Sequence, residues 1–573
     1  MPLLLAATLV LAGCVSVPTS GPVVEGRAAG EPVPPPNVAV IATGPRDGDS
    51  PVAIVEGFLA AMASYQPGYP TAREFLTPDA ASQWRPESGI ALYGAGEGSR
   101  NVSQTEEGVA ISLGLDARVS EDGSYSAVEE GSRLVLDLAV EQVDGQYRIA
   151  TPPDGLVMTA FDFTREFGAF SSYFFDPAYD VLVPDLIYLP VRGNLPTLLV
   201  QELLDGPTQW LDPAVRSALG PGVDLASGAV VQAGTLARVD LTSQVAATSA
   251  EQRDRLAAQL AWTLRQAPGV AEIQVLADGQ PLALPRSQTG IVSADEYAVY
   301  DPADVPAGDE LFAVADGRVV AVDDEQAEPV PGPLGEPAGF RSVAVNRVAT
   351  QAVAVSEGGT TLIRARLSQG AESETVEVGS DLSVPSYDRE NRVWLVDRGA
   401  QSSRVLLLGE QPEPVAIPAG ALEQVRVERL TLAPDGVRAA AVYQTDSGPR
   451  LLLALVLVGP DGGLELGQPR DLPLEQVDPV DVAWASATAL ALLASDEGEP
   501  QPYLVELSNA TLSSRGEVSG AQSVTVSPGQ PLVIGTGPVV LEGSEEAQPV
   551  VLRQDALQEW VPLVPARSPI YPG

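Results

Sequence analysis

The chain has 573 residues, 45% of them hydrophobic, a length that predicts about three or four domains of ~150 residues each. Its 76 acidic and 33 basic residues leave a net charge of −43, which argues against binding to nucleic acid or to anionic headgroups. All basic residues are arginine, histidine is absent and cysteine occurs once. These absences exclude Ser-His-Asp and Cys-His nucleophiles, histidine zinc sites, the lysine phosphate loop and lysine Schiff bases. We therefore expect no catalytic residue, no metal and no cofactor.

The first 14 residues resemble a bacterial lipoprotein signal peptide. An apolar run from Leu3 to Val10 precedes the lipobox Leu11, Ala12 and Gly13, and the only cysteine, Cys14, follows directly. The run holds about 10 residues, whereas a membrane-spanning helix needs ~20, so it fits a signal peptide better than an anchor helix. We predict that Cys14 is acylated and becomes the mature N-terminus.

Two features qualify the signal-peptide prediction. No charged residue precedes Cys14, although such peptides usually begin with a basic segment, and this is consistent with a translation start further upstream. An ordinary secretory peptide with a cysteine near its end is the alternative. If Cys14 is acylated, two or three fatty chains hold the protein stably to a bilayer. The expected location is then the extracytoplasmic face of the cell membrane.

Residues 15–49 predict a tether, because prolines interrupt small and polar residues and no apolar period is present. From residue 50 the pattern changes. Ser50-Pro51 is a good helix start, and a second helical piece, Tyr69 to Trp84, is interrupted at Thr77-Pro78. Strand-like runs follow, joined by Asp122-Gly123 and Asp144-Gly145 turn signals: Val109 to Val119, Leu134 to Val140 and Tyr147 to Ile149. Helices followed by an antiparallel sheet predict an NTF2-like α+β domain over residues 50–178.

Residues 179–295 form a second predicted unit, with a strand at Val181 to Leu189 and a helix that ends at Gly206-Pro207. Ser249 and Gln252 predict a capping box for a later helix, and Asp278-Gly279 predicts a hairpin turn. Three segments resemble the GerMN domain of envelope and sporulation proteins: Ile187-Tyr188-Leu189, Leu203 to Thr208 and Ala237 to Thr242. The resemblance implies a GerMN α/β fold and names no ligand.

Residues 296–573 are rich in strands and turns. Similar segments begin at Ser342, Leu382, Leu430, Val480 and Val524, a period of about 40 to 50 residues that is typical of β-propeller blades. We predict an all-β propeller of about five to six blades, in which Leu311 to Val322 and the strand Trp560 to Val564 close the ring. A β-sandwich with chance spacing is the alternative.

The order of these parts, with Pro18-Thr19-Ser20-Gly21-Pro22 soon after the cysteine, resembles the LpqB family of actinobacterial lipoproteins over nearly the whole chain. That resemblance implies an accessory role beside the MtrA–MtrB two-component system. The lipoprotein would bind the extracytoplasmic domain of an MtrB-like sensor histidine kinase and affect envelope and division signalling.

Two other functions stay open. One is a passive scaffold that binds glycan or cell wall. The other is a glycosidase with two carboxylates, which require a separation of about 5–9.5 Å. The acids fall mostly in turns, for example Asp435 and Asp461, where capping and solvation explain them.

Overall fold

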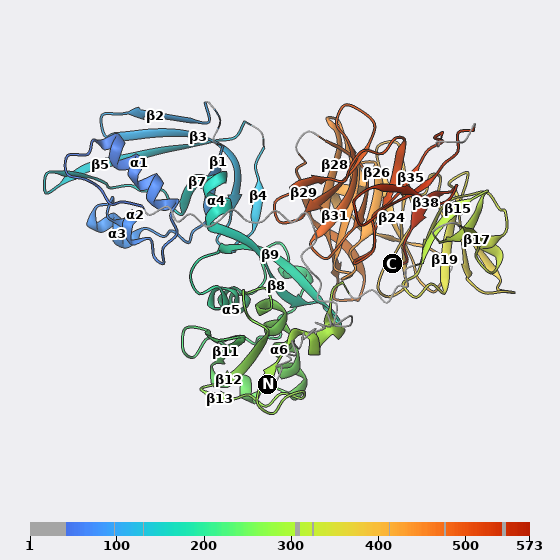
Figure 1. The fold of residues 1–573 in the computed structure, drawn as a ribbon, viewed down its shortest axis with the longest axis horizontal. Coiled ribbons are helices and arrows are strands. Elements are labelled where there is room, and N and C mark those ends of the chain that lie inside the picture. The colour runs from blue at the N-terminus through green and yellow to red at the C-terminus, as the bar shows by residue number, and fades with distance from the viewer. Residues whose placement is uncertain are drawn as a thin grey trace, which may run out of the picture. The chain divides into compact units, whose positions relative to one another are not determined.

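The structure is a computed structural model that describes residues 42–573, except 95, 97, 130, 304–309, 324–325, 412, 475–476 and 541–545 (Figure 1). The signal peptide, Cys14 and most of the predicted tether lie outside the described residues.

Three helices begin the described chain: α1 (Pro51–Met62), α2 (Pro70–Arg73) and α3 (Pro78–Gln83). Each has proline at its first position, where a missing N–H leaves no hydrogen bond unmade. Ser50 Oγ accepts from the Ala53 N–H at 3.2 Å, and Thr77 Oγ1 accepts from the Ala80 N–H at 3.3 Å. These caps confirm the predicted helix start and the predicted break.

A seven-stranded sheet follows, in the order β6-β5-β3-β1-β7 with β2 and β4 on β3. The Asp144-Gly145 turn joins β5 to β6, with both residues at positive φ, and confirms that hairpin. Neighbouring strands of this sheet are antiparallel, except that β1 and β7 are parallel. The helix α4 (Ala160–Glu166) completes the domain. The strands are β1 (Ile90–Tyr93), β2 (Arg100–Gln104), β3 (Gly108–Val119), β4 (Tyr125–Ala127), β5 (Arg133–Val143), β6 (Gln146–Ile149) and β7 (Leu156–Thr159).

The second region begins with the hairpin of β8 (Phe167–Phe175) and β9 (Leu182–Pro190). The predicted boundary between residues 178 and 179 falls in the turn of this hairpin, so both sides of it belong to one sheet. Helices α5 (Leu195–Asp205) and α6 (Ala250–Leu264) share a core with the strands, and β11 is parallel to β12. The other strands are β10 (Val231–Ala233), β11 (Leu236–Leu241), β12 (Glu272–Ala277), β13 (Gln280–Pro281) and β14 (Ile291–Val292).

Local signals in this region also appear in the structure. Ser249 Oγ accepts from the Gln252 N–H at 3.1 Å, which is one half of the predicted capping box and begins α6. Gly206 ends α5 with φ of 104°, a conformation that favours glycine. Asp278 and Gly279 both have positive φ and turn β12 into β13, as predicted.

The third region, coloured yellow to red in Figure 1, consists of six four-stranded sheets whose inner strands form a ring. This confirms the predicted propeller and sets its blade number at the upper value of the predicted range. The innermost strands β18, β22, β26, β30, β34 and β38 contact one another in turn, and β38 contacts β18. Read from the inside outward, the first two blades are β38 (Arg567–Ile570), β15 (Leu311–Ala315), β16 (Arg318–Val322) and β17 (Ala327–Pro329), and then β18 (Phe340–Val345), β19 (Gln351–Ser356), β20 (Thr361–Arg366) and β21 (Ser373–Glu377). The next two are β22 (Ser386–Tyr387), β23 (Val393–Arg398), β24 (Ser403–Leu408) and β25 (Val415–Ile417), and then β26 (Val427–Leu432), β27 (Arg438–Thr445), β28 (Gly448–Val458) and β29 (Leu464–Leu472). The last two are β30 (Asp478–Trp484), β31 (Ala489–Ser495), β32 (Gln501–Glu506) and β33 (Leu512–Ser514), and then β34 (Ala521–Thr525), β35 (Val533–Thr536), β36 (Val551–Gln554) and β37 (Trp560–Pro562).

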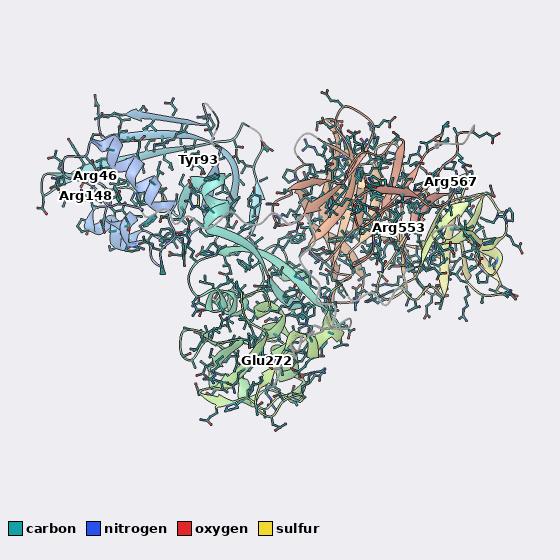
Figure 2. All side chains as sticks on the ribbon, viewed as in Figure 1. Arg46, Tyr93, Arg148, Glu272, Arg553 and Arg567 are labelled. Carbon is teal, nitrogen blue, oxygen red and sulfur yellow. The ribbon has the colours of Figure 1, made fainter. Side chains whose placement is uncertain are left out.

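The closing strand differs from the prediction. Trp560–Pro562 is β37, the outer strand of its own blade, and the ring closes through β38, which pairs with β15. The β38 strand was missed because Arg567-Ser568-Pro569-Ile570 has no apolar alternation. Arg567, labelled in Figure 2, donates through Nη2 to the carbonyl oxygen of Phe340 at 2.8 Å and pairs with Glu357. This side chain ties the closing strand to the next blade.

Candidate functional site

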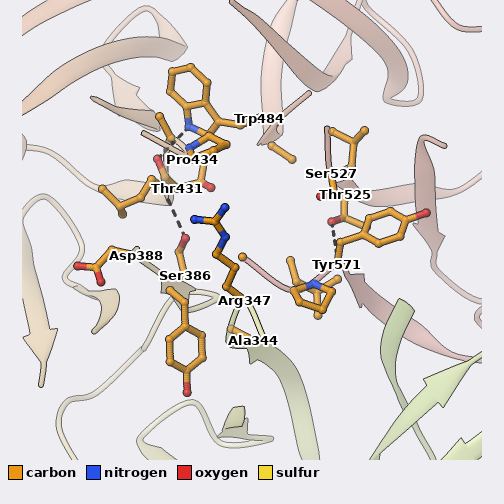
Figure 3. A pocket seen from close by; sticks show the side chains of 18 of the residues that line it. Ala344, Arg347, Ser386, Asp388, Thr431, Pro434, Trp484, Thr525, Ser527 and Tyr571 are labelled. Carbon is orange, nitrogen blue, oxygen red and sulfur yellow. Dashed lines mark hydrogen bonds between the residues drawn. The ribbon is translucent and has the colours of Figure 1, made fainter. Parts of the chain in front are cut away.

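A cavity lies at one end of the propeller, where the innermost strands run into the turns that follow them (Figure 3). Its volume is about 90 Å³, enough for a small molecule. All six blades contribute to its lining, which comprises Ala344 and Arg347, residues 385–389, 429 and 431–434, Ala483 and Trp484, 525–528, and 570–573. The site therefore exists only when the ring is closed.

Polar side chains close three of the turns around this cavity by accepting hydrogen bonds from backbone N–H groups two or four residues further along the chain. In the first, Asn346 Oδ1 accepts from the backbone N–H of Thr350 at 2.8 Å. Asp388 Oδ1 accepts from the backbone N–H of Arg392 at 2.9 Å, and Asp435 Oδ1 does so from Val437 at 2.9 Å. Side chains of this type favour such turns because they replace backbone partners. The repeat thus fixes the backbone that carries the lining residues.

Asp435 corrects part of the sequence interpretation. It caps its turn as predicted, but it is only 2% exposed, so solvation does not explain it. The Arg438 guanidinium donates through Nε to Asp435 Oδ2 at 2.9 Å and balances the buried charge. Asp461 matches the interpretation, since it is exposed and accepts from the Gly463 N–H at 3.1 Å.

Three arginines line the cavity, each from a different blade. Figure 3 shows Arg347 reaching toward the middle of the cavity. Arg389 donates through Nη1 to the carbonyl oxygen of Pro434 at 2.9 Å. Arg429 is buried, and its Nε lies 3.3 Å from Asp481 Oδ1. Burial raises the pKa of Asp481, and the charge of Arg429 opposes that shift.

Hydroxyl and aromatic groups form the rest of the polar wall. Trp484 Nε1 donates to the carbonyl oxygen of Thr431 at 3.3 Å, and the Tyr571 N–H donates to Thr525 Oγ1 at 3.3 Å (Figure 3). Burial raises the pKa of the Tyr387 phenol, which keeps it neutral. The wall thus combines flat apolar surface with hydrogen-bonding groups, as small-molecule sites do.

Asp388 is the one carboxylate side chain among the described lining residues. Its Oδ2 accepts from Arg392 Nε at 2.7 Å and from Trp394 Nε1 at 2.8 Å, and Figure 3 shows it turned away from the middle of the cavity. A glycosidase needs a second acid about 5–9.5 Å away, one as proton donor and one as nucleophile or base. The described lining does not supply that pair.

The sequence-predicted site residues are elsewhere: Leu11, Ala12, Gly13 and Cys14 lie outside the described residues. Over the described ranges, no helix has the length and apolar character to cross a membrane. In those same ranges, acidic side chains do not gather into a group that could hold a metal ion. Sequence reasoning missed the cavity arginines, although a repeated signal exists: Asn346-Arg347 and Asp388-Arg389 each place arginine directly after a turn-closing residue.

Comparison with known proteins assigns all three regions. The family model described as "Lipoprotein LpqB, N-terminal domain" matches residues 44–164, "Sporulation and spore germination" matches 171–283, and "Lipoprotein LpqB beta-propeller domain" matches 317–572. Lipoprotein LpqB of Thermobifida fusca is 29% identical over 99% of this chain and 97% of its own. That of Streptomyces coelicolor is 29% identical over 99% and 96%. TolB from Acinetobacter baumannii, a solved structure, covers 56% of this chain and 85% of its own at 14% identity and a TM-score of 0.36.

These matches and the ring of six blades define a multidomain, mainly β protein in which a GerMN domain precedes a propeller. The chain belongs to the LpqB lipoprotein family, as the sequence predicts. Membership makes it a membrane-anchored lipoprotein.

Proposed function

We propose that this lipoprotein is held by acylated Cys14 at the extracytoplasmic face of the membrane, where it binds and modulates an MtrB-like sensor histidine kinase. The observation that supports a recognition role is the propeller cavity, which has a polar lining. The one carboxylate side chain in its described lining, that of Asp388, already accepts hydrogen bonds from Arg392 and Trp394. A binding role fits such a site better than hydrolysis does. The kinase as partner rests on the family resemblance.

Modulation requires the lipoprotein to bind one signalling state of the kinase more tightly than the other, since equal affinity shifts no equilibrium. A difference of about 1–3 kcal/mol gives a bias of about 5–150-fold. Anchoring both proteins to one membrane raises their effective concentration, so weak contacts suffice.

Chemical crosslinking in intact membranes, followed by mass spectrometry, tests this function. The full chain is expected to form adducts with the external domain of the kinase. The Cys14→Ser variant is expected to leave the membrane fraction and lose most of these adducts, while Ser16→Ala, the matched control beside it, retains them. Absence of kinase adducts with the wild-type chain would contradict the proposal, and membrane recovery of Cys14→Ser would contradict the anchor.

A wall- or glycan-binding scaffold is the second candidate, because the Trp484 indole and the hydroxyls of Thr525 and Ser527 line the cavity. Sugars bind to such combinations of aromatic surface and hydrogen-bonding groups. Sedimentation with purified cell walls tests it: wild type should sediment, and Trp484→Ala should sediment less. Equal sedimentation of both would exclude the cavity as the wall-binding site.

A further inference from the structure

The side chains that line the propeller cavity include more basic than acidic groups, unlike the chain as a whole. The whole chain carries a net charge of −43, whereas the charged side chains in the described lining of the cavity are three arginines and one aspartate, and Arg429 among them is paired with Asp481. A concave site with walls of low dielectric focuses the field of its charges. The cavity is therefore a place where this acidic protein attracts an anion.

The arginines are arranged to hold an anion from more than one side. Arg347 comes from the turn after β18, Arg389 from the turn after β22, and Arg429 lies on β26. The bond of Arg389 to Pro434 is to a neutral carbonyl oxygen, so it positions the guanidinium without cancelling its charge. Arg429 is held by Asp481 at 3.3 Å, which fixes it as part of the wall. Arg347 is the arginine that reaches the middle (Figure 3).

Size and wall chemistry define the kind of anion. The cavity of about 90 Å³ admits a small molecule and is too small for a folded segment. Planar guanidinium groups match the oxygens of carboxylates and phosphates. Thr431, Thr525 and Ser527 offer hydroxyls to a polar body, while Trp484 offers a flat apolar surface. These groups fit a short hydroxylated chain that ends in an oxyanion.

We propose that the propeller cavity is a binding site for a small organic anion with one carboxylate or phosphate group, and that Arg347 makes the main contact with that group. This proposal goes beyond the kinase interaction, because the anion needs no kinase to be present in order to bind. The turn-closing hydrogen bonds of Asn346 and Asp388 hold the backbone in place before the ligand arrives, so little ordering is needed on binding.

Isothermal titration calorimetry on the full chain in detergent tests this site with three matched probes. Glycerol is neutral, glycerate carries a carboxylate, and glycerol 3-phosphate carries a phosphate. We expect one or both anions to bind, with an affinity that falls as salt is raised, and no binding of glycerol. The anion with the lower Kd shows whether the site prefers a carboxylate or a phosphate group. Equal binding of glycerol, or no binding of either anion, would overturn the proposal.

Variants locate the ligand. Arg347→Gln is expected to raise the Kd of the bound anion by about tenfold or more, because a charge-assisted hydrogen bond is lost. Arg450→Gln, an exposed arginine on β28 outside the cavity, is the matched control and should leave the Kd unchanged. Equal Kd values for wild type and Arg347→Gln would overturn the assignment. If Arg347→Gln does not fold, tryptophan fluorescence of wild type and Trp484→Phe locates the ligand instead. We expect the anion to change the fluorescence of the wild type and Trp484→Phe to lose that change. Persistence of the change in Trp484→Phe would place the ligand elsewhere.

Discussion

Asp185 is expected to make the GerMN domain more stable at acidic than at alkaline pH. The residue lies on β9 and is 4% exposed. Its two oxygens accept from the backbone N–H of Thr208 at 2.6 Å and from the Thr208 hydroxyl at 2.9 Å. Burial outweighs these bonds and raises the pKa of Asp185 from 3.8 to about 7. Above pH 7 the folded protein must therefore hold a buried charge that the unfolded chain keeps in water.

The size and sign of this effect follow from linkage. The pKa of Asp185 is about 7 in the folded state, against 3.8 for an ordinary aspartate. Above pH 7 this difference corresponds to a destabilisation of the folded state by at most ~4 kcal/mol. Asp185 takes up a proton near pH 7 in the folded state but only near pH 4 in the unfolded chain, so between these values the folded state binds one proton more. The free energy of unfolding therefore rises across that window. Asp185→Asn removes the charge and keeps an acceptor for Thr208, so it should stabilise the domain at pH 8 by about 1–3 kcal/mol and by much less at pH 5.

Thermal unfolding of the full chain at pH 5 and pH 8 measures this difference. Because a chain of several domains does not unfold in one step, Leu203→Ala, a truncation in the same core, marks the transition that belongs to the GerMN domain. Asp180→Asn, an exposed acid in the same region, is the control and should show no pH-dependent gain. A loss of stability in Asp185→Asn at pH 8, or an equal gain at both pH values, would refute the reasoning.

Two further predictions concern the other domains. Burial alone would raise the pKa of Asp381, but hydrogen bonds from Arg398 and Arg341 outweigh it and lower that pKa to about 2. The stabilisation is present above pH ~4 and lost as pH falls toward 2, so Asp381→Asn should lower the free energy of unfolding at pH 7 by about 1 kcal/mol, with a smaller difference in urea titrations at pH 3. Gly155→Ala should destabilise the N-terminal domain by about 1–3 kcal/mol, because φ is +72° and the added Cβ would lie 2.3 Å from the carbonyl oxygen of Gly89. A melting temperature equal to wild type would contradict that.

Signals within a few residues were sufficient for the local structure. Ser50 and Thr77 cap helices, and the Asp144-Gly145 pair turns a hairpin, because each preference acts through a bond or dihedral inside the same short segment. The strand β38 could not be predicted in this way. Its pairing with β15 joins the two ends of the ring, and its own four residues show no apolar alternation.

The cavity was beyond local reasoning for a related reason. Its arginines are ordinary turn or strand residues in sequence, and they converge only when three consecutive blades pack side by side within the closed ring. The same strand that closes the ring, β38, leads into Tyr571, whose N–H bonds to Thr525 in the cavity wall. Ring closure and cavity formation are therefore one structural event, and a change that opens the ring at β38 removes the site without altering any arginine of the cavity.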